Sequence, residues 1–195
     1  PSHRVAAVDC GTNSIRLLIA QIVPEKGATE EISRRNTIVR LGEGVDETGM
    51  LSAAAIERTR AALADYVAEM EREGVGAVRM VATSATRDAG NREDFFSMTR
   101  ELLGRIQPGA EAEVISGEEE AALSFAGATA DLDAARGPAC VIDLGGGSTE
   151  FIIGEGFQPL ERESLQMGCI ATPRRFFPDG KLSRKRWQAG QLELA

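Results

Sequence analysis

The chain has 195 residues, 43% of them hydrophobic, and a formal net charge of −8, which is the composition of an ordinary globular protein. Because it has no basic excess, non-specific binding to nucleic acid is disfavoured. Its length suffices for one good core or two modest lobes. The sequence has no run of 18 apolar residues and no charged leader with an apolar segment, so it predicts neither membrane insertion nor secretion.

Three cysteines and one histidine restrict the chemistry that the chain can offer. Cys10, Cys140 and Cys169 are far apart and form no Cys-x-x-Cys pair, which predicts a reducing, cytoplasmic location. The single histidine, His3, stands near the first residue. A catalytic triad with histidine and a zinc site with several histidines are therefore excluded within this chain, so acid or base catalysis falls to carboxylates.

The first 41 residues predict an antiparallel meander. Its predicted elements are a buried strand at 5–8 that ends at Asp9, a turn at 10–14, and further strands at 15–23 and 32–41.

From residue 52 onwards helices and strands alternate, which implies parallel pairing in an α/β sheet. Ser52 is predicted to cap a helix that ends at Gly74, and Asn91 a helix with apolar positions as far as Ile106. The other predicted elements are a strand at 78–82 with an exit loop at 83–87, a strand at 112–115 and a helix from 117 to about 132.

The opening pattern returns after residues 133–138, whose small residues and Gly-Pro predict a linker. The spacing Asp-x-Gly-x-x-Ser occurs twice, each time between two predicted strands, as Asp9, Gly11, Ser14 and as Asp143, Gly145, Ser148. Such an internal repeat indicates duplicated units. We therefore predict a first lobe at 1–132 and a second lobe at 139–195, the latter incomplete because strand-helix alternation does not follow its meander.

The second turn has the residues of an anion site. Gly145, Gly146, Gly147 and Ser148 let the backbone approach a ligand closely and direct N–H groups at it. Asp143, Glu150 and Asp9 offer hard oxygen ligands of the kind that bind Mg²⁺, which usually accompanies phosphate. The Walker and Rossmann glycine fingerprints are absent. Two facing turns would suit phosphoryl transfer, which needs positioning and charge stabilisation.

Glu120 is the candidate general base. Ser116 and Glu119 have capping-box spacing, and Glu118 is explained by the helix dipole, so neither acidic residue requires a catalytic role. Glu120 has no such local duty and follows a strand exit, where ligands collect in α/β sheets. From its position alone, a structural role is an equally good interpretation.

Basic residues offer contacts to a phosphate chain. Arg87 and Arg16 could each bind phosphate in a bidentate manner, and Arg87 is favoured because its loop precedes a helix N-terminus. An exposed strand residue is an equally good interpretation of Arg16. Residues 174–186 carry six basic side chains against Asp179 alone, which fits either a solvated helix face or a surface that guides a polyanion.

Four motifs in order resemble the exopolyphosphatase and guanosine pentaphosphate phosphohydrolase (Ppx/GppA) family, a branch of the actin, sugar kinase and Hsp70 superfamily. They span residues 8–17, 82–89, 115–121 and 141–150. The resemblance implies an α/β, actin-like, ribonuclease-H-like fold of two duplicated lobes with mixed sheets and an active site in the cleft between them. It also implies magnesium-assisted release of orthophosphate from the end of inorganic polyphosphate.

The resemblance further assigns roles to individual residues. Glu120 is similar to the general base of the family, and Asp143 and Glu150 to residues near metal and phosphate. Residues 145–148 resemble its phosphate loop, which Asn13, Ser14 and Arg87 join from the first lobe. Members normally complete the second lobe, which this chain does not.

Three other activities remain as alternatives to the exopolyphosphatase. The first is hydrolysis of guanosine pentaphosphate, the second a polyphosphate- or nucleotide-binding module without catalysis, and the third a sugar kinase. The expected partner is inorganic polyphosphate or guanosine pentaphosphate, not nucleic acid or a membrane. The quaternary state is left open and includes a homodimer.

Overall fold

The computed structural model describes residues 3–23, 28–132, 137–156, 158–165, 167–177, 179–181 and 183–193. The chain divides into two compact units, Pro1–Gly117 and Glu118–Ala195. This division falls before the predicted lobe boundary, so the helix that follows residue 117 belongs almost wholly to the second unit. Of the predicted linker, residues 133–136 lie outside the described residues.

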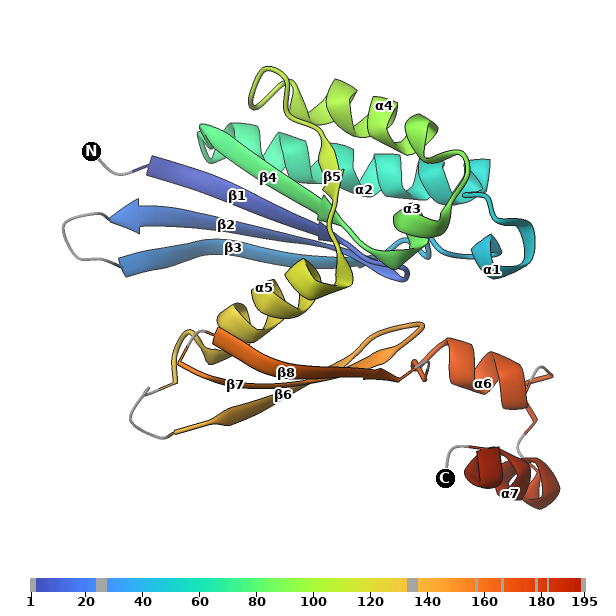
Figure 1. The fold of residues 1–195 in the computed structure, drawn as a ribbon. Helices are drawn as coiled ribbons and strands as arrows, with labels where there is room; N and C mark the ends of the chain where they lie inside the picture. The colour runs from blue at the N-terminus through green and yellow to red at the C-terminus, as the bar shows by residue number, and fades with distance from the viewer. Residues whose placement is uncertain are drawn as a thin grey trace. The chain divides into compact units, whose positions relative to one another are not determined.

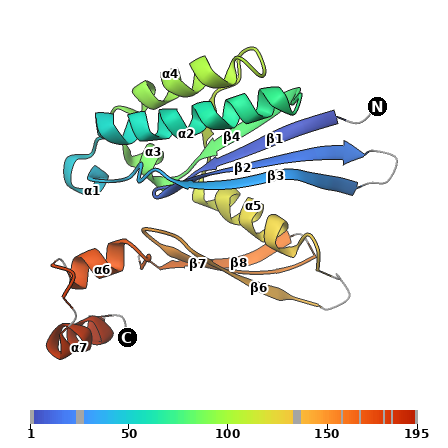
Figure 2. The same ribbon diagram turned by 180° about the vertical axis from the view of Figure 1, so that it is seen from behind.

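The first unit is a five-stranded mixed sheet in the order β3-β2-β1-β4-β5. Strands β1 to β3 form the predicted antiparallel meander, and β4 and β5 join in parallel. Helices α2 and α4 lie together over one face of this sheet (Figures 1 and 2). The elements are β1 (His3–Cys10), β2 (Ser14–Val23), β3 (Ala28–Ile38), α1 (Val45–Thr48), α2 (Ala53–Arg72), β4 (Ala77–Ala82), α3 (Ser84–Asp88), α4 (Arg92–Leu103) and β5 (Ala112–Val114).

Alternation along the strands produces the core of the first unit. Alternate residues are buried from Ala6 to Cys10 in β1 and from Ile15 to Ile19 in β2, and these side chains join the apolar faces of α2 and α4 in one cluster. Helix α2 begins as predicted, because the Ser52 hydroxyl accepts a hydrogen bond from Ala55 N at 3.1 Å. The buried Tyr66 hydroxyl donates a hydrogen bond to Ile15 O at 3.0 Å, which ties the helix to the sheet.

The second unit repeats the meander as the antiparallel sheet β6-β7-β8. Helix α5 packs on this sheet because Phe125, which is fully buried, lies in one cluster with Ala121 and Ile152. The opposite face of β6 carries Ile142 and Leu144, which are exposed. The elements are α5 (Gly117–Thr129), β6 (Ala139–Leu144), β7 (Thr149–Glu155), β8 (Gln158–Leu165), α6 (Ala171–Phe176) and α7 (Arg184–Glu193).

Several predicted boundaries were wrong. The third strand occupies 28–38 instead of 32–41, because Val39 N and Arg40 N leave the ladder and bind the carbonyl of Asn13 at 3.0 and 2.9 Å. The predicted exit loop 83–87 is mostly helix α3. Ile106 lies beyond α4, and Asn91 precedes that helix without capping it, because its side-chain amide binds the backbone of Leu51.

The predicted α/β fold class is confirmed by this topology: the five-stranded sheet is mixed as predicted, whereas the described sheet of the second unit is antiparallel. Among the described residues, no helix is both long enough and apolar enough to cross a membrane.

Candidate functional site

The glycine turn of the second unit joins β6 to β7 and is closed by a hydrogen bond from Gly145 N to Ser148 O at 2.9 Å. A side chain at Gly145 would crowd this turn, since a Cβ there would lie 3.1 Å from Ser148 O. Within the described residues, the N–H groups of Gly146, Gly147 and Ser148 donate to no acceptor. These N–H groups are therefore available to an anion.

The first unit contains the same turn, which confirms that the sequence repeat is a structural one. Gly11 N donates to Ser14 O at 3.0 Å, as Gly145 N does to Ser148 O. The turn also contacts the start of α3, because the hydroxyls of Thr12 and Ser84 are 2.9 Å apart. Asn13, a predicted phosphate ligand, lies in this turn with its carbonyl bound by the segment after β3.

Beside the second turn, two predicted metal ligands lie on one face of the sheet. Asp143 and Glu150 are directly opposite each other in the β6-β7 register. The Ser124 hydroxyl donates to Asp143 Oδ2 at 3.1 Å, and the Ser164 hydroxyl donates to Glu150 Oε1 at 3.0 Å. Like charges in register destabilise a sheet, so a bound cation at this position would be favourable. A group of three or more His, Cys, Asp or Glu side chains suited to a metal is not found in the described part of the chain.

At the equivalent place in the first unit, the charges are opposite. Asp9 lies across from Arg16 in the β1-β2 register, and Arg16 Nη1 is 3.4 Å from Asp9 Oδ2. Both side chains are substantially exposed, so this pair contributes at most about 1 kcal/mol of stability. Arg16 therefore offsets the charge of Asp9, and the two turns, although alike in backbone, differ in charge.

Glu120 lies on the face of α5 that carries Ser124, because residues four apart share a helix face. Ser124 contacts Asp143, whereas the C-terminal end of the helix contacts the far end of the sheet, where the Thr129 hydroxyl lies 3.4 Å from Gly156 O. Glu120 is one turn closer to the helix start, so it lies toward the glycine turn. Its side chain is half-buried. The second unit thus brings the candidate base, both carboxylates and the glycine turn to one end of its sheet.

Arg87 belongs to the first unit. It lies in the last turn of α3, and its Nη1 donates to Ile115 O at 3.2 Å, next to the end of β5. Thr83 N donates to Cys10 O at 3.2 Å, so α3 begins beside the first turn. The predicted site residues therefore form two groups. The group in the first unit is Asp9, Asn13, Ser14, Arg16 and Arg87; the group in the second is Glu120, Asp143, Gly145, Gly146, Gly147, Ser148 and Glu150.

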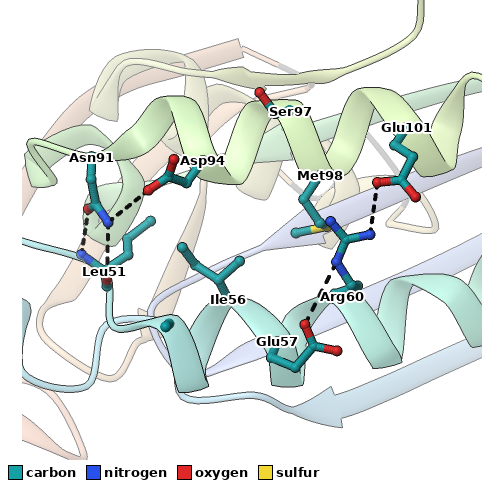
Figure 3. Close-up of a pocket in the computed structure, with 10 residues that line it drawn as sticks. Leu51, Ile56, Glu57, Arg60, Asn91, Asp94, Ser97, Met98 and Glu101 are labelled. Atoms are coloured by element: carbon teal, nitrogen blue, oxygen red, sulfur yellow. Dashed lines mark hydrogen bonds and ion pairs between the residues drawn. The ribbon is translucent and has the colours of Figure 1, made fainter.

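A pocket of about 450 Å³ lies between α2 and α4 in the first unit (Figure 3). None of the predicted site residues lines it. It contains the carboxylates of Glu57, Asp94 and Glu101, and its one guanidinium, Arg60, is paired with Glu101 at 2.9 Å and with Glu57 at 3.8 Å. The excess of negative charge makes this pocket unsuitable for a phosphate chain.

The basic stretch 174–186 runs from the second half of α6 to the start of α7. Most of its basic side chains are exposed, and Arg186 is paired with Asp179. This pairing lowers the pKa of the Asp179 carboxyl, with a smaller contribution from the backbone N–H of Lys181. Arg175 lies over the ring of Phe176, 5.5 Å from its centroid. Exposed cations of one sign give this stretch a positive surface that favours an anionic ligand.

Sequence reasoning missed three residues that shape the turns. Gly42 and Gly168 pack against the first and second turn, respectively, and Ser124 holds Asp143. The position of Ser124, one helical turn after Glu120, is a signal that could have been used. Nothing in the local sequence distinguishes Gly42 and Gly168 from other loop glycines.

The chain is thus an α/β protein in which a strand-turn-strand unit occurs twice, each copy with the same closing hydrogen bond in its turn. The model of the Ppx/GppA phosphatase family matches residues 18–194, and the chain belongs to that family.

Two relatives and one solved structure are representative. The chain is 51% identical over 174 residues to Exopolyphosphatase 2 of Mycobacterium tuberculosis, and the aligned residues cover 88% of this chain and 54% of the relative. It is 36% identical to the guanosine-5'-triphosphate,3'-diphosphate pyrophosphatase of Vibrio parahaemolyticus, over 94% of this chain and 35% of the relative. The crystal structure of the Aquifex aeolicus family member superposes with a TM-score of 0.73 at 35% identity, covering 97% of this chain and 59% of that one. The chain spans about half the length of the first of these relatives.

Proposed function

We propose that the protein is a phosphoanhydride hydrolase of the exopolyphosphatase type, which releases orthophosphate from the end of inorganic polyphosphate. The observation that carries this proposal is the contact of Ser124 with Asp143, because it places the polar face of α5 beside the carboxylates at the glycine turn. The relative named Exopolyphosphatase 2, at 51% identity, supports the choice of polyphosphate.

In this proposal the terminal phosphate binds at the turn of residues 145–148. The N–H groups of Gly146, Gly147 and Ser148 donate to its oxygens, and the Ser148 hydroxyl adds a further donor. Donors fixed in a folded turn need little reorganisation when charge develops on the phosphoryl group. Asn13, Ser14, Arg16 and Arg87 of the first unit are proposed to bind phosphate as well.

Asp143 and Glu150 are proposed to hold a divalent cation, Mg²⁺ by preference. The two carboxylates fit this role, because they face each other across two strands and each has one oxygen hydrogen-bonded to a serine hydroxyl. When bound, the cation neutralises negative charge on the phosphoryl oxygens. Asp9 is a weaker candidate, since Arg16 already provides its carboxylate with a positive partner.

Glu120 is proposed to accept a proton from the water that attacks the terminal phosphorus in line. The proposal is supported by its place one helical turn before Ser124, whose hydroxyl donates to Asp143, because residues four apart share a helix face. The leaving phosphate chain departs opposite to the attacking water. The exposed cations of 174–186 are proposed to attract the polyanion before it binds, an effect that falls as ionic strength rises.

The decisive experiment compares Glu120→Gln with Glu118→Gln in the full-length protein. Both change one carboxylate in the first turn of α5, but Glu118 is exposed and has no role in the proposal. Glu120→Gln should lower orthophosphate release from polyphosphate by about 10²- to 10⁴-fold, with polyphosphate binding nearly intact, because a positioned base contributes that much. Glu118→Gln should stay close to wild type.

Polyphosphate and guanosine pentaphosphate are tested side by side, and each outcome has a distinct meaning. Unchanged orthophosphate release in Glu120→Gln would overturn the assignment of the base. If the wild-type protein turns over guanosine pentaphosphate faster than polyphosphate, guanosine pentaphosphate replaces polyphosphate as the proposed substrate, in agreement with the name of the second relative. Tight binding of polyphosphate with no release at any Mg²⁺ concentration would show a binding module. A cytoplasmic location and a homodimer stay predictions.

A further inference from the structure

The segment at residues 167–170 packs against the back of the second glycine turn. Cys169 N donates to Gly145 O at 3.0 Å, and Ile170 N donates to Gly146 O at 3.0 Å. The Thr149 hydroxyl, which follows the turn, donates to Met167 O. The two segments are thus joined by hydrogen bonds at both ends of 167–170.

Gly168 has no room for a side chain in this contact. A Cβ at this position would lie 2.2 Å from Gly146 O and 2.5 Å from Gly147 N. These are backbone atoms, so a rotamer change cannot relieve the overlap. Any larger residue at 168 must displace either the turn or the segment.

The first unit has a related arrangement. After β3, Gly42 N donates to Thr12 O at 2.8 Å, and a Cβ at Gly42 would lie 2.4 Å from Thr12 Cγ2. Thr12 has the place in the first turn that Gly146 has in the second, since each directly follows the first glycine of the repeat. A glycine after the third strand therefore lies against the turn in both copies.

The planarity of the trans peptide determines the direction of the N–H groups in the second turn. In a trans peptide, C=O and the next N–H point in opposite directions. Because Gly145 C=O and Gly146 C=O point at the segment 167–170, the N–H groups of Gly146 and Gly147 must point away from it. Two successive N–H groups directed to one side make an anion-binding nest.

We propose that Gly168 is a positioning residue for the phosphate turn. By lacking a side chain, it lets the segment 167–170 bind the turn's carbonyls and so fixes the direction of the two N–H groups that receive phosphate. This role rests on the proposed function of the turn, while the contact between the two segments can be tested without it.

The contact is tested by amide hydrogen exchange on the full-length protein, comparing Gly168→Ala with Gly127→Ala. Gly127 lies in α5, and a Cβ there would meet nothing within 4 Å. In Gly168→Ala the amides of Cys169 and Ile170 should exchange at least about tenfold faster, because they lose their acceptors. Gly127→Ala should leave both amides as in wild type. Unchanged exchange in Gly168→Ala would overturn the proposal.

The functional consequence is tested by the KM and kcat for polyphosphate. A displaced turn should raise KM by about tenfold or more, since a shift of about 1 Å can cost 10²-fold in kcat/KM. If Gly168 had a purely structural role, Gly168→Ala would lower the fraction of active protein and therefore kcat, while KM stayed unchanged. That result would also overturn the positioning role. A wild-type protein that releases no phosphate would refute the proposed function, and hydrogen exchange would still decide the contact.

If Gly168→Ala does not fold, Thr149→Val provides the same test. This change removes the hydroxyl that donates to Met167 O. Faster exchange at Cys169 and Ile170 would support the contact, and exchange equal to wild type would overturn it.

Discussion

Replacing Phe125 with alanine should unfold the second unit while the first stays folded. Phe125 is fully buried and is the only large aromatic side chain in the described core of that unit, where it packs with Ala121 and Ile152. A Phe→Ala change in a core costs about 3–5 kcal/mol, against a total stability of about 5–15 kcal/mol for a domain. Because the cluster is small, this loss removes most of what holds α5 to the sheet.

Phe95→Ala is the matched control, since Phe95 is equally buried but lies in the larger core of the first unit. Hydrogen exchange read by mass spectrometry should show lost protection across 139–165 in Phe125→Ala and unchanged protection in β1 and β2. Phosphate release should fall as well, because Glu120 leaves the turn when α5 detaches. Unchanged protection of 139–165 would refute the assignment of α5 to the second unit's core.

Two further predictions concern the first unit. Arg35 and the Ser33 hydroxyl donate hydrogen bonds to Glu69 and hold its pKa below the ordinary 4.5. The ionised carboxylate therefore stabilises the fold at pH values above the unfolded pKa, and this stability is lost as the pH falls through the folded pKa. Glu69→Gln should therefore cost about 1–3 kcal/mol at pH 7 in urea unfolding, and a penalty that did not shrink below about pH 4.5 would contradict this. Gly42→Ala should cost about 1–3 kcal/mol by overlap with the Thr12 methyl, and Thr12→Ser should restore most of it; additive losses in the double variant would disprove the contact.

The two turns show how a duplicated backbone can acquire different chemistry. Each has the same closing hydrogen bond and the same spacing of Asp, Gly and Ser. The residue after the turn that faces the aspartate is Arg16 in the first unit and Glu150 in the second. This difference offsets the charge at Asp9 and doubles it at Asp143, which is why the proposed cation site is in the second unit.

The prediction of elements succeeded where a local rule applied and failed where a distant contact decided. Strands β1 and β2 and the Ser52 cap follow from neighbouring residues, and all three were predicted. The Asn91 cap was wrong, because the side chain binds Leu51, which is 40 residues away. The extent of β3 was wrong because the carbonyl of Asn13 draws Val39 and Arg40 out of the ladder.

The sequence by itself determined the meander, its duplication and the residue types at each turn, because strand periodicity and turn spacing are encoded within about ten residues. Only the tertiary structure decided that Ser124, and with it the helix face it shares with Glu120, reaches Asp143, and that Gly168 lies against the back of the glycine turn. The physical reason is that such contacts join segments whose packing depends on the whole core, and local sequence carries no record of which segment will be the neighbour.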